Sequence, residues 1–126
     1  MIEEIIKLSC YYCDIKREEF DSPNRDKEIL FARYFVAYYL RNNYNTTNKV
    51  LSLKRIGKLI NRDHATVLNA IRQMQYAIDY NYCGYGWLYD KFAKRVNEMY
   101  KGESTVVDEK GEVISVNLTN HIRKVA

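Results

Sequence analysis

The sequence is poor in the residues that mark several large classes of protein. Its 126 residues include one proline, five glycines and three cysteines. So few prolines and glycines argue against a collagen-like or low-complexity chain, and an odd, sparse set of cysteines is not a disulfide framework. The apolar runs are too short to cross a bilayer, and the acidic N-terminal residues differ from the basic start of a secretory signal. The composition therefore predicts a soluble, cytoplasmic protein with no membrane partner.

Histidines and cysteines are also too few for the commoner metal sites. Cys10 and Cys13 form a C-x-x-C, but Cys83, His64 and His121, the other residues of these types, have no metal-ligand spacing with the pair. Both sulfurs belong to an apolar helical pattern, so we expect core cysteines in preference to a redox pair or half a zinc site. The phosphate-binding motif G-x-x-x-x-G-K-[ST] is absent. We therefore expect no enzyme activity, metal, cofactor or bound nucleotide.

Charge is distributed unevenly along the chain. Residues 1–32 carry a net charge of −3 and residues 79–126 are neutral, whereas residues 33–78 hold eight basic side chains against Asp63 alone. Segregated positive charge attracts polyanions, and a compact, helical, basic segment indicates nucleic acid more than a basic tail would. The alternative is a solvated helix surface, which normally mixes both signs. The middle segment is therefore the candidate binding region.

Apolar residues recur at helical spacing through most of the chain. The pattern predicts helices over about residues 2–13 and 26–41, and the second has an apolar surface wide enough for the central helix of a bundle. DSPNRDKE, with the only proline, separates the two, and the polar NNYNTTNK after the second predicts a solvent-facing connection. The expected fold class is all-α, a small helical bundle.

Two further helices are predicted around a short polar turn. Ser52 is a candidate N-cap for the helix SLKRIGKLI, in which Gly57 allows a neighbour to approach closely. NRDH then turns the chain, and Asn61 or Asp63 is the candidate cap of a helix that extends to about residue 78. The polar face of that helix carries no acidic residue. This arrangement is typical of a helix-turn-helix and its recognition helix.

The segment LSLKRIGKLINRDHATVLNAIRQM resembles the DNA-binding domain of the bacterial replication initiator DnaA, which is Trp-repressor-like. It follows that family's pattern of Leu-Ser-Leu-x-x-Ile-Gly, a short turn and Arg-Asp-His-Thr-Thr-Val-Leu. Upstream, IEEIIKLSCYYCDIKREEF and EILFARYFVAYYL resemble the family's opening helix and long helix, so the similarity covers about residues 1–78. The resemblance implies a double-stranded DNA partner.

The resemblance also implies which residues contact DNA, with the start of the recognition helix in the major groove. Ala65 replaces the first of the family's two threonines and Asn69 replaces a frequent histidine, so the preferred DNA sequence does not carry over. Lys54 and Arg55 stand where the family often has Pro-Glu, and we interpret them as phosphate contacts. The candidate DNA-binding residues are Arg62, Asp63, His64, Ala65, Thr66, Asn69 and Arg72, together with Arg25, Arg33, Lys54 and Arg55.

Several of these residues also have a structural interpretation. An aspartate at the start of a helix is usually a cap, so Asp63 either caps the helix, contacts a base or does both. His64 has a satisfied structural role as its alternative, and Arg33 is either a structural or a phosphate contact. Arg25 is the candidate for minor-groove contact, although acidic neighbours offset the charge of its loop.

Beyond residue 78 the resemblance fades. DYNYCGYGWLYDKF is dense in aromatic residues, which stack on unpaired bases in some proteins. The same region also predicts a packing helix, which is the interpretation we favour. The apolar residues of that predicted helix are Trp87, Leu88, Phe92, Val96 and Met99.

The C-terminal segment STVVDEKGEVISVNL alternates polar and apolar residues around a turn and predicts a β-hairpin. An isolated hairpin is marginal, so it should pack on the helices or on another copy. We therefore predict a helical DNA-binding domain over residues 1–101 and a hairpin or extended tail over residues 102–126, with a homodimer contact through this tail as one alternative.

Two functions of different class follow as hypotheses. The first is sequence-specific binding of double-stranded DNA, in replication control or transcription regulation of a phage or other mobile element, because the initiator's ATPase motif is missing. The second is an adaptor that binds a replication partner and keeps only a vestigial DNA contact. Replacing Arg62 and His64 by alanine should abolish specific duplex binding under the first hypothesis alone.

Overall fold

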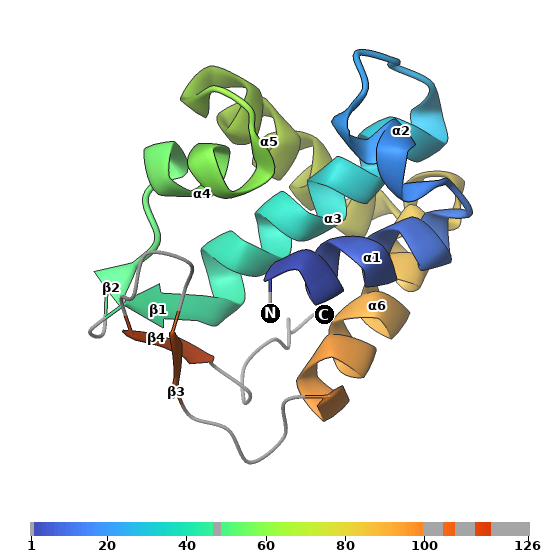
Figure 1. Ribbon diagram of the computed structural model, residues 1–126. Helices are drawn as coiled ribbons and strands as arrows, with labels where there is room; N and C mark the ends of the chain where they lie inside the picture. The colour runs from blue at the N-terminus through green and yellow to red at the C-terminus, as the bar shows by residue number, and fades with distance from the viewer. Residues whose placement is uncertain (1, 47–48, 100–104, 108–112, 117–126) are drawn as a thin grey trace.

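The computed structural model describes residues 2–46, 49–99, 105–107 and 113–116, and most of these residues are helical. The helices form one bundle, and short strands lie at one end of it (Figure 1). In chain order the elements are α1 (Ile2–Cys13), α2 (Arg17–Asp21), α3 (Lys27–Asn43), β1 (Tyr44–Thr46), β2 (Lys49–Val50), α4 (Leu53–Ile60), α5 (His64–Tyr80), the 3₁₀-helix η1 (Tyr82–Gly84), α6 (Tyr85–Met99), β3 (Thr105–Val107) and β4 (Val113–Val116).

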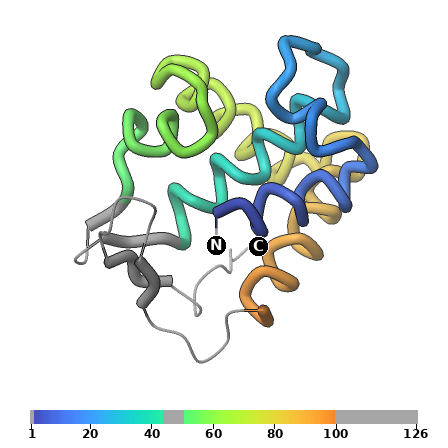
Figure 2. The backbone as a smooth tube through the Cα atoms, viewed as in Figure 1, coloured from blue at the N-terminus to red at the C-terminus, as the bar shows by residue number. Residues whose placement is uncertain are grey.

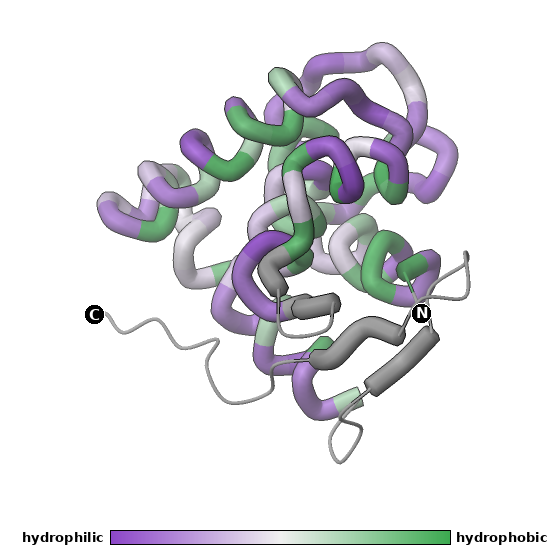
Figure 3. The backbone as a smooth tube through the Cα atoms, turned by 90° about the vertical axis from the view of Figure 1, so that its left-hand side faces the viewer, coloured by the Kyte–Doolittle hydropathy of each residue, from purple (hydrophilic) through white to green (hydrophobic). Residues whose placement is uncertain are grey.

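Helix α3 is the central element of the bundle. It crosses the middle of the molecule and contacts α1, α2, α4, α5 and α6 (Figure 1). Its apolar surface is wide, because Phe35, Tyr39 and Leu40 are all fully buried. Along the helices the tube in Figure 3 alternates between hydrophobic and hydrophilic segments, as amphipathic helices around a shared core do. The predicted central helix is confirmed.

Helices α4 and α5 form the predicted helix-turn-helix, two helices that meet at a tight bend beside α3 (Figure 2). The Ser52 hydroxyl caps α4 as predicted, since it accepts the backbone N–H of Arg55 at 3.0 Å. Asn61 ends α4 in the left-handed conformation with φ of 62°. The next backbone N–H, that of Arg62, donates to the carbonyl of Gly57 at 2.8 Å, so the turn folds back onto the glycine.

The connection after α3 differs from the solvent-facing loop predicted for it. Strand β1 pairs antiparallel with β2, and it also pairs with β4, so the sheet order is β2-β1-β4-β3. The antiparallel pairing of β3 with β4 is that of the predicted C-terminal hairpin. Strands of two to four residues are too short to show a period, and β1 pairs with a segment about seventy residues away, so local pattern did not reveal it.

Helix α6 confirms a packing helix in the aromatic segment but buries a different set of residues. Phe92 and Val96 are buried as predicted, whereas Trp87 is 60% exposed and Met99 is 39% exposed. Tyr89 is buried instead. The buried side chains of Tyr85, Tyr89, Phe92 and Val96 follow a helix face rotated slightly from the one inferred, because the many apolar residues of this segment fit more than one helical phase.

Cys10 and Cys13 are buried core residues of α1, as predicted. Burial raises the pKa of Cys10 to about 11, and burial raises the pKa of Cys13 as well, so both thiols stay protonated. Among the residues that the structure describes, no three Cys, His, Asp or Glu side chains gather where they could hold a metal ion. No helix in that same part of the chain has the length and apolarity needed to cross a membrane.

Candidate nucleic-acid interface

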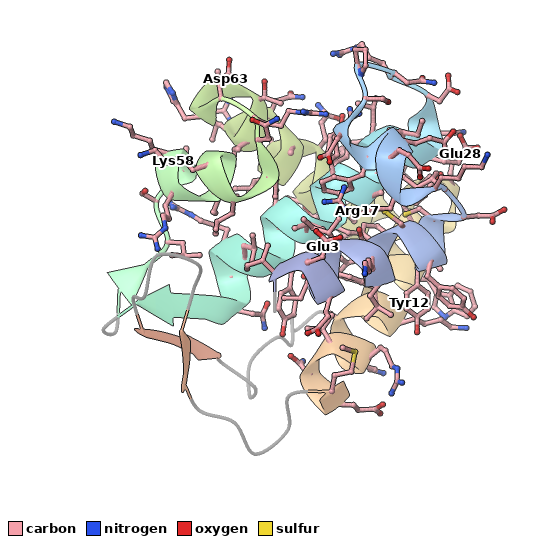
Figure 4. All side chains as sticks on the ribbon, viewed as in Figure 1. Glu3, Tyr12, Arg17, Glu28, Lys58 and Asp63 are labelled. Carbon is pink, nitrogen blue, oxygen red and sulfur yellow. The ribbon has the colours of Figure 1, made fainter. Side chains whose placement is uncertain are left out.

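Helix α5 begins with a cap made by Asp63. One carboxylate oxygen accepts the backbone N–H of Thr66 at 2.8 Å. Hydrogen bonds from the Thr66 side chain and backbone lower the pKa of Asp63. Of the two candidate caps Asp63 therefore takes the role, and it lies at the tip of the α4–α5 turn (Figure 4). His64, Ala65 and Thr66 are exposed on the first turn, which is fixed locally and open to a ligand.

A groove of about 620 Å³ lies between α5 and the loop that joins α2 to α3, and we call it the loop–helix groove. The loop supplies one wall and the first two turns of α5 supply the other. The floor comes from α3 and from the end of α4. The groove is lined by Asp21, Ser22, Pro23, Arg25, Leu30, Arg33, Tyr34, Ile60, Arg62, Ala65, Thr66, Val67, Asn69 and Ala70.

A second pocket, of about 450 Å³, lies between α4 and the start of α5, and we call it the turn pocket. Lys54 and Lys58, one helical turn apart on α4, supply two exposed ammonium groups. Lys58 was not among the residues predicted from the sequence, although its spacing of four from Lys54 places both on one face. The pocket is lined by Lys54, Gly57, Lys58, Asn61, Arg62, Asp63 and His64.

Arg33 takes the structural role that was one of its two alternatives. The residue is only 7% exposed, and its guanidinium donates to backbone carbonyls of α2 and the following loop. Nε donates to Phe20 at 2.8 Å, and Nη2 donates to Ser22 and to Asn24. Burial lowers the pKa of Arg33, and the positive charges of Arg62 and Arg25 add to this effect. Arg33 thus holds the loop in place beneath the groove.

Arg62 reaches the same loop from the other side of the groove. Its Nη2 donates to the carbonyls of Phe20 and Ser22, both at 3.1 Å, so two arginines share the same two acceptors. This contact links the α4–α5 turn directly to the loop. No sequence pattern relates residue 62 to residue 20, which are 42 positions apart, so this hydrogen bond could be found only in the structure.

The structure brings together most of the predicted site residues. Arg62 lines both hollows, so they meet at the turn that begins α5. Two predicted residues lie outside them: Arg55 is half-buried on α4, and Arg72 is exposed further along α5. The loop–helix groove holds Arg25, Arg33, Arg62, Ala65, Thr66 and Asn69, and the turn pocket holds Lys54, Arg62, Asp63 and His64.

Comparison with known proteins matches the same part of the chain. Relatives named chromosomal replication initiator protein DnaA include that of Bacteroides thetaiotaomicron, 36% identical over 75 residues, and that of Ureaplasma parvum, 36% identical over 78 residues. These alignments cover 59% and 61% of this chain. A DnaA 1 protein of Chlamydia pneumoniae is 26% identical over 98 residues, or 78% of this chain.

These alignments cover a small part of each relative. The chain spans 15% of the length of the Bacteroides protein, 16% of the Ureaplasma protein and 20% of the Chlamydia protein. The match to the family described as bacterial DnaA protein helix-turn-helix covers residues 2–74, which includes α1 to α4 and most of α5. With its two caps, its tight turn and this match, the chain belongs to the helix-turn-helix family of the bacterial DnaA protein.

Proposed function

We propose that the chain binds double-stranded DNA sequence-specifically, with the first turn of α5 in the major groove. The observation that carries the proposal is the pair of cationic hollows that meet at this turn. Helix-turn-helix domains read base edges with the N-terminal residues of the recognition helix and fix it with phosphate contacts on either side. The exposed side chains of the first turn are the base-reading candidates, and the flanking cations are the phosphate contacts.

Each exposed residue has a specific task in this proposal. His64 exchanges a hydrogen bond with a base edge, Thr66 offers a hydroxyl and a methyl group, and Asn69 suits the paired donor and acceptor of adenine. Ala65 has only a methyl group, which suits contact with thymine. Arg25, on the loop wall of the loop–helix groove, follows the DNA backbone and reaches into the minor groove next to the major groove that α5 occupies.

The remaining cations position the duplex. Lys54 and Lys58 contact phosphates from the turn pocket, and Arg72 contacts one further along α5. Asp63 keeps its capping role when DNA is bound, and Arg33 acts only through the loop that it holds. The biological setting, replication control or transcription regulation in a phage or mobile element, stays a prediction, and the names of the relatives support the replication side.

The test is selection of bound duplexes from a randomised DNA pool, followed by affinity measurements on the enriched sequence. Replacing His64 and Thr66 together by alanine should weaken binding to that sequence about a hundredfold, because each lost base contact is worth roughly 1–3 kcal/mol. This pair is a sharper choice than one that includes Arg62, which also holds the loop. Lys7→Ala, which removes an exposed cation of α1, is the control and should change affinity less than twofold.

The phosphate contacts have a separate signature. The logarithm of the affinity should fall linearly with the logarithm of the salt concentration, and each phosphate contact adds roughly 0.9 to the slope. Lys58→Ala should reduce the slope by about one contact and weaken all duplexes alike. If the selection enriched no DNA sequence and no variant changed the salt dependence of the affinity, the proposal would be contradicted. The alternative, an adaptor that binds a replication partner, would then be favoured.

A further inference from the structure

The five tyrosines of residues 76–89 divide into a buried set and an exposed set. Tyr85 and Tyr89 belong to the core, whereas Tyr76, Tyr80 and Tyr82 are 53%, 71% and 43% exposed. We call these three exposed residues the tyrosine cluster. Single exposed apolar residues are ordinary, but a contiguous group of large exposed rings marks an interaction site.

The tyrosine cluster is the outer end of a series of ring contacts that starts in the core. Phe31 stacks on the buried Tyr85 with ring centroids 3.9 Å apart, and Tyr82 stacks on Phe31 at 6.1 Å. Tyr76 lies 6.3 Å from Tyr82 and 4.8 Å from Tyr80. Rings supported in this way lose little further freedom when a ligand lies against them. The cluster is therefore preorganised for binding.

The tyrosine cluster continues the exposed side of α5 away from the proposed major-groove contact. Thr66 precedes Tyr76 by ten residues and Tyr80 by fourteen, which corresponds to about 15 and 21 Å along a helix. The major groove is only about 12 Å wide. A duplex held by the first turn of α5 would therefore not extend its groove over the cluster, so a ligand of the cluster would lie beside that duplex.

Cations lie at the rim of the cluster. The ammonium nitrogen of Lys27 is 6.0 Å from the ring centroid of Tyr82, and Arg72 lies one helical turn before Tyr76 on the exposed side of α5. The acidic neighbour on α5 is Asp79, whose carboxylate accepts the side-chain amide of Gln75 at 2.9 Å. Exposed aromatic faces with cations beside them are the arrangement that holds unpaired nucleotides.

We propose that the tyrosine cluster is a stacking platform for unpaired bases of single-stranded DNA that leaves the duplex bound by α5. The position of the strand rests on the proposed duplex binding. The stacking itself rests on the exposed rings, because paired bases already have both faces covered inside a duplex, whereas unpaired bases offer a free π-face. Recognition of this kind tolerates any base sequence.

The experiment compares three labelled DNA probes by fluorescence anisotropy: the selected duplex, the same duplex with an oligothymidylate overhang on either end, and free oligothymidylate. The overhang should tighten binding by the wild-type chain. Tyr76→Ala with Tyr80→Ala should lose that gain, about tenfold for each stacked base, and should bind the blunt duplex unchanged. Tyr76→Phe with Tyr80→Phe is the matched control, which keeps the ring faces and should keep the gain.

Several outcomes would overturn the platform. An equal gain from the overhang in the alanine variant and the wild type would show that the rings do not bind it. An equal loss in the phenylalanine control and the alanine variant would assign the effect to the hydroxyl groups. A dimer in ultracentrifugation that dissociates in the alanine variant would make the cluster a contact between copies. If the chain bound oligothymidylate through these tyrosines but bound no duplex, the stacking platform would be supported. The proposed sequence-specific duplex binding would then be wrong.

Discussion

The two walls of the loop–helix groove are held by different physics. The wall made by the first turns of α5 is positioned by the α4–α5 turn, which is fixed by close backbone packing against Gly57 and by the caps of Ser52 and Asp63. The α2–α3 loop is instead held by the guanidiniums of Arg33 and Arg62, which donate to the carbonyls of Phe20, near the end of α2, and of Ser22, where the loop begins. The first wall therefore depends on local size and turn conformation, and the second depends on charged hydrogen bonds from residues distant in sequence.

The largest effect should come from Gly57, where the turn that positions the first wall has no room for a side chain. A Cβ at this position would fall within clash distance of the carbonyl oxygen of Arg62, a backbone atom that cannot rotate away. Gly57→Ala should lower the free energy of unfolding by about 3 kcal/mol or more. The measurement is urea denaturation, and affinity for the selected duplex should fall with the displaced turn.

A glycine elsewhere in the chain supplies the matched control. Gly84 has a φ of 79°, but an added Cβ would meet no atom within 4 Å. Gly84→Ala should therefore cost only about 1 kcal/mol, the price of a left-handed alanine. A loss at Gly57 no larger than that at Gly84 would show that close contact with the Arg62 carbonyl does not limit the turn.

The second wall should be broken by Arg33→Ala, with a somewhat smaller loss of about 2–3 kcal/mol. The substitution leaves carbonyls of Phe20 and Ser22 with fewer donors and removes a buried side chain. Hydrogen exchange should accelerate first in residues 22–26, while the amides of α4 and α5 stay protected. Arg33→Lys should recover only part of the loss, because an ammonium lacks the planar fork that reaches several carbonyls. Uniform acceleration over the whole chain would contradict a local tether.

Arg33 and Arg62 donate to the same two carbonyls, so a third and smaller effect is expected when Arg62 is replaced. Arg62→Ala alone should cost about 1 kcal/mol, since Arg33 still donates to the same carbonyls. The double variant should lose more than the sum of the single losses, by about 0.5–1 kcal/mol, because it removes both donors and because each single variant also relieves repulsion between the two cations. Additive losses would mean that the two arginines do not act on one loop.

The contrast between the walls also explains how much could be predicted from the sequence. The helix-turn-helix was predicted with the Ser52 cap, the Asp63 candidate and the role of Gly57, because each depends on neighbours a few residues away. The double arginine tether was missed, since it joins residues thirteen and forty-two positions from Phe20. Strand β1 was missed for the same reason. The candidate site was thus predictable where its geometry is local, and the loop wall was not.

The smallest effect concerns pH, and it tests the first wall through Asp63. Hydrogen bonds from Thr66 lower the pKa of Asp63 in the folded state, below the value of about 3.9 typical of an unfolded chain. The charged cap therefore stabilises the fold above that value, and the stabilisation is lost as pH falls through the lowered pKa. Asp63→Asn keeps a capping oxygen but removes the charge that favours a helix N-terminus.

The Tm difference between the wild type and Asp63→Asn should accordingly be a few degrees at most near neutral pH and should vanish in acid. Ser52→Ala supplies the control, because it removes the uncharged cap of α4 and its cost should not change with pH. If the Tm difference between the wild type and Asp63→Asn stayed constant into acid, the negative charge of the carboxylate would not stabilise the turn, and only the position of its capping oxygen would matter. In that case both walls of the groove would still differ in packing, but only the loop wall would depend on charge.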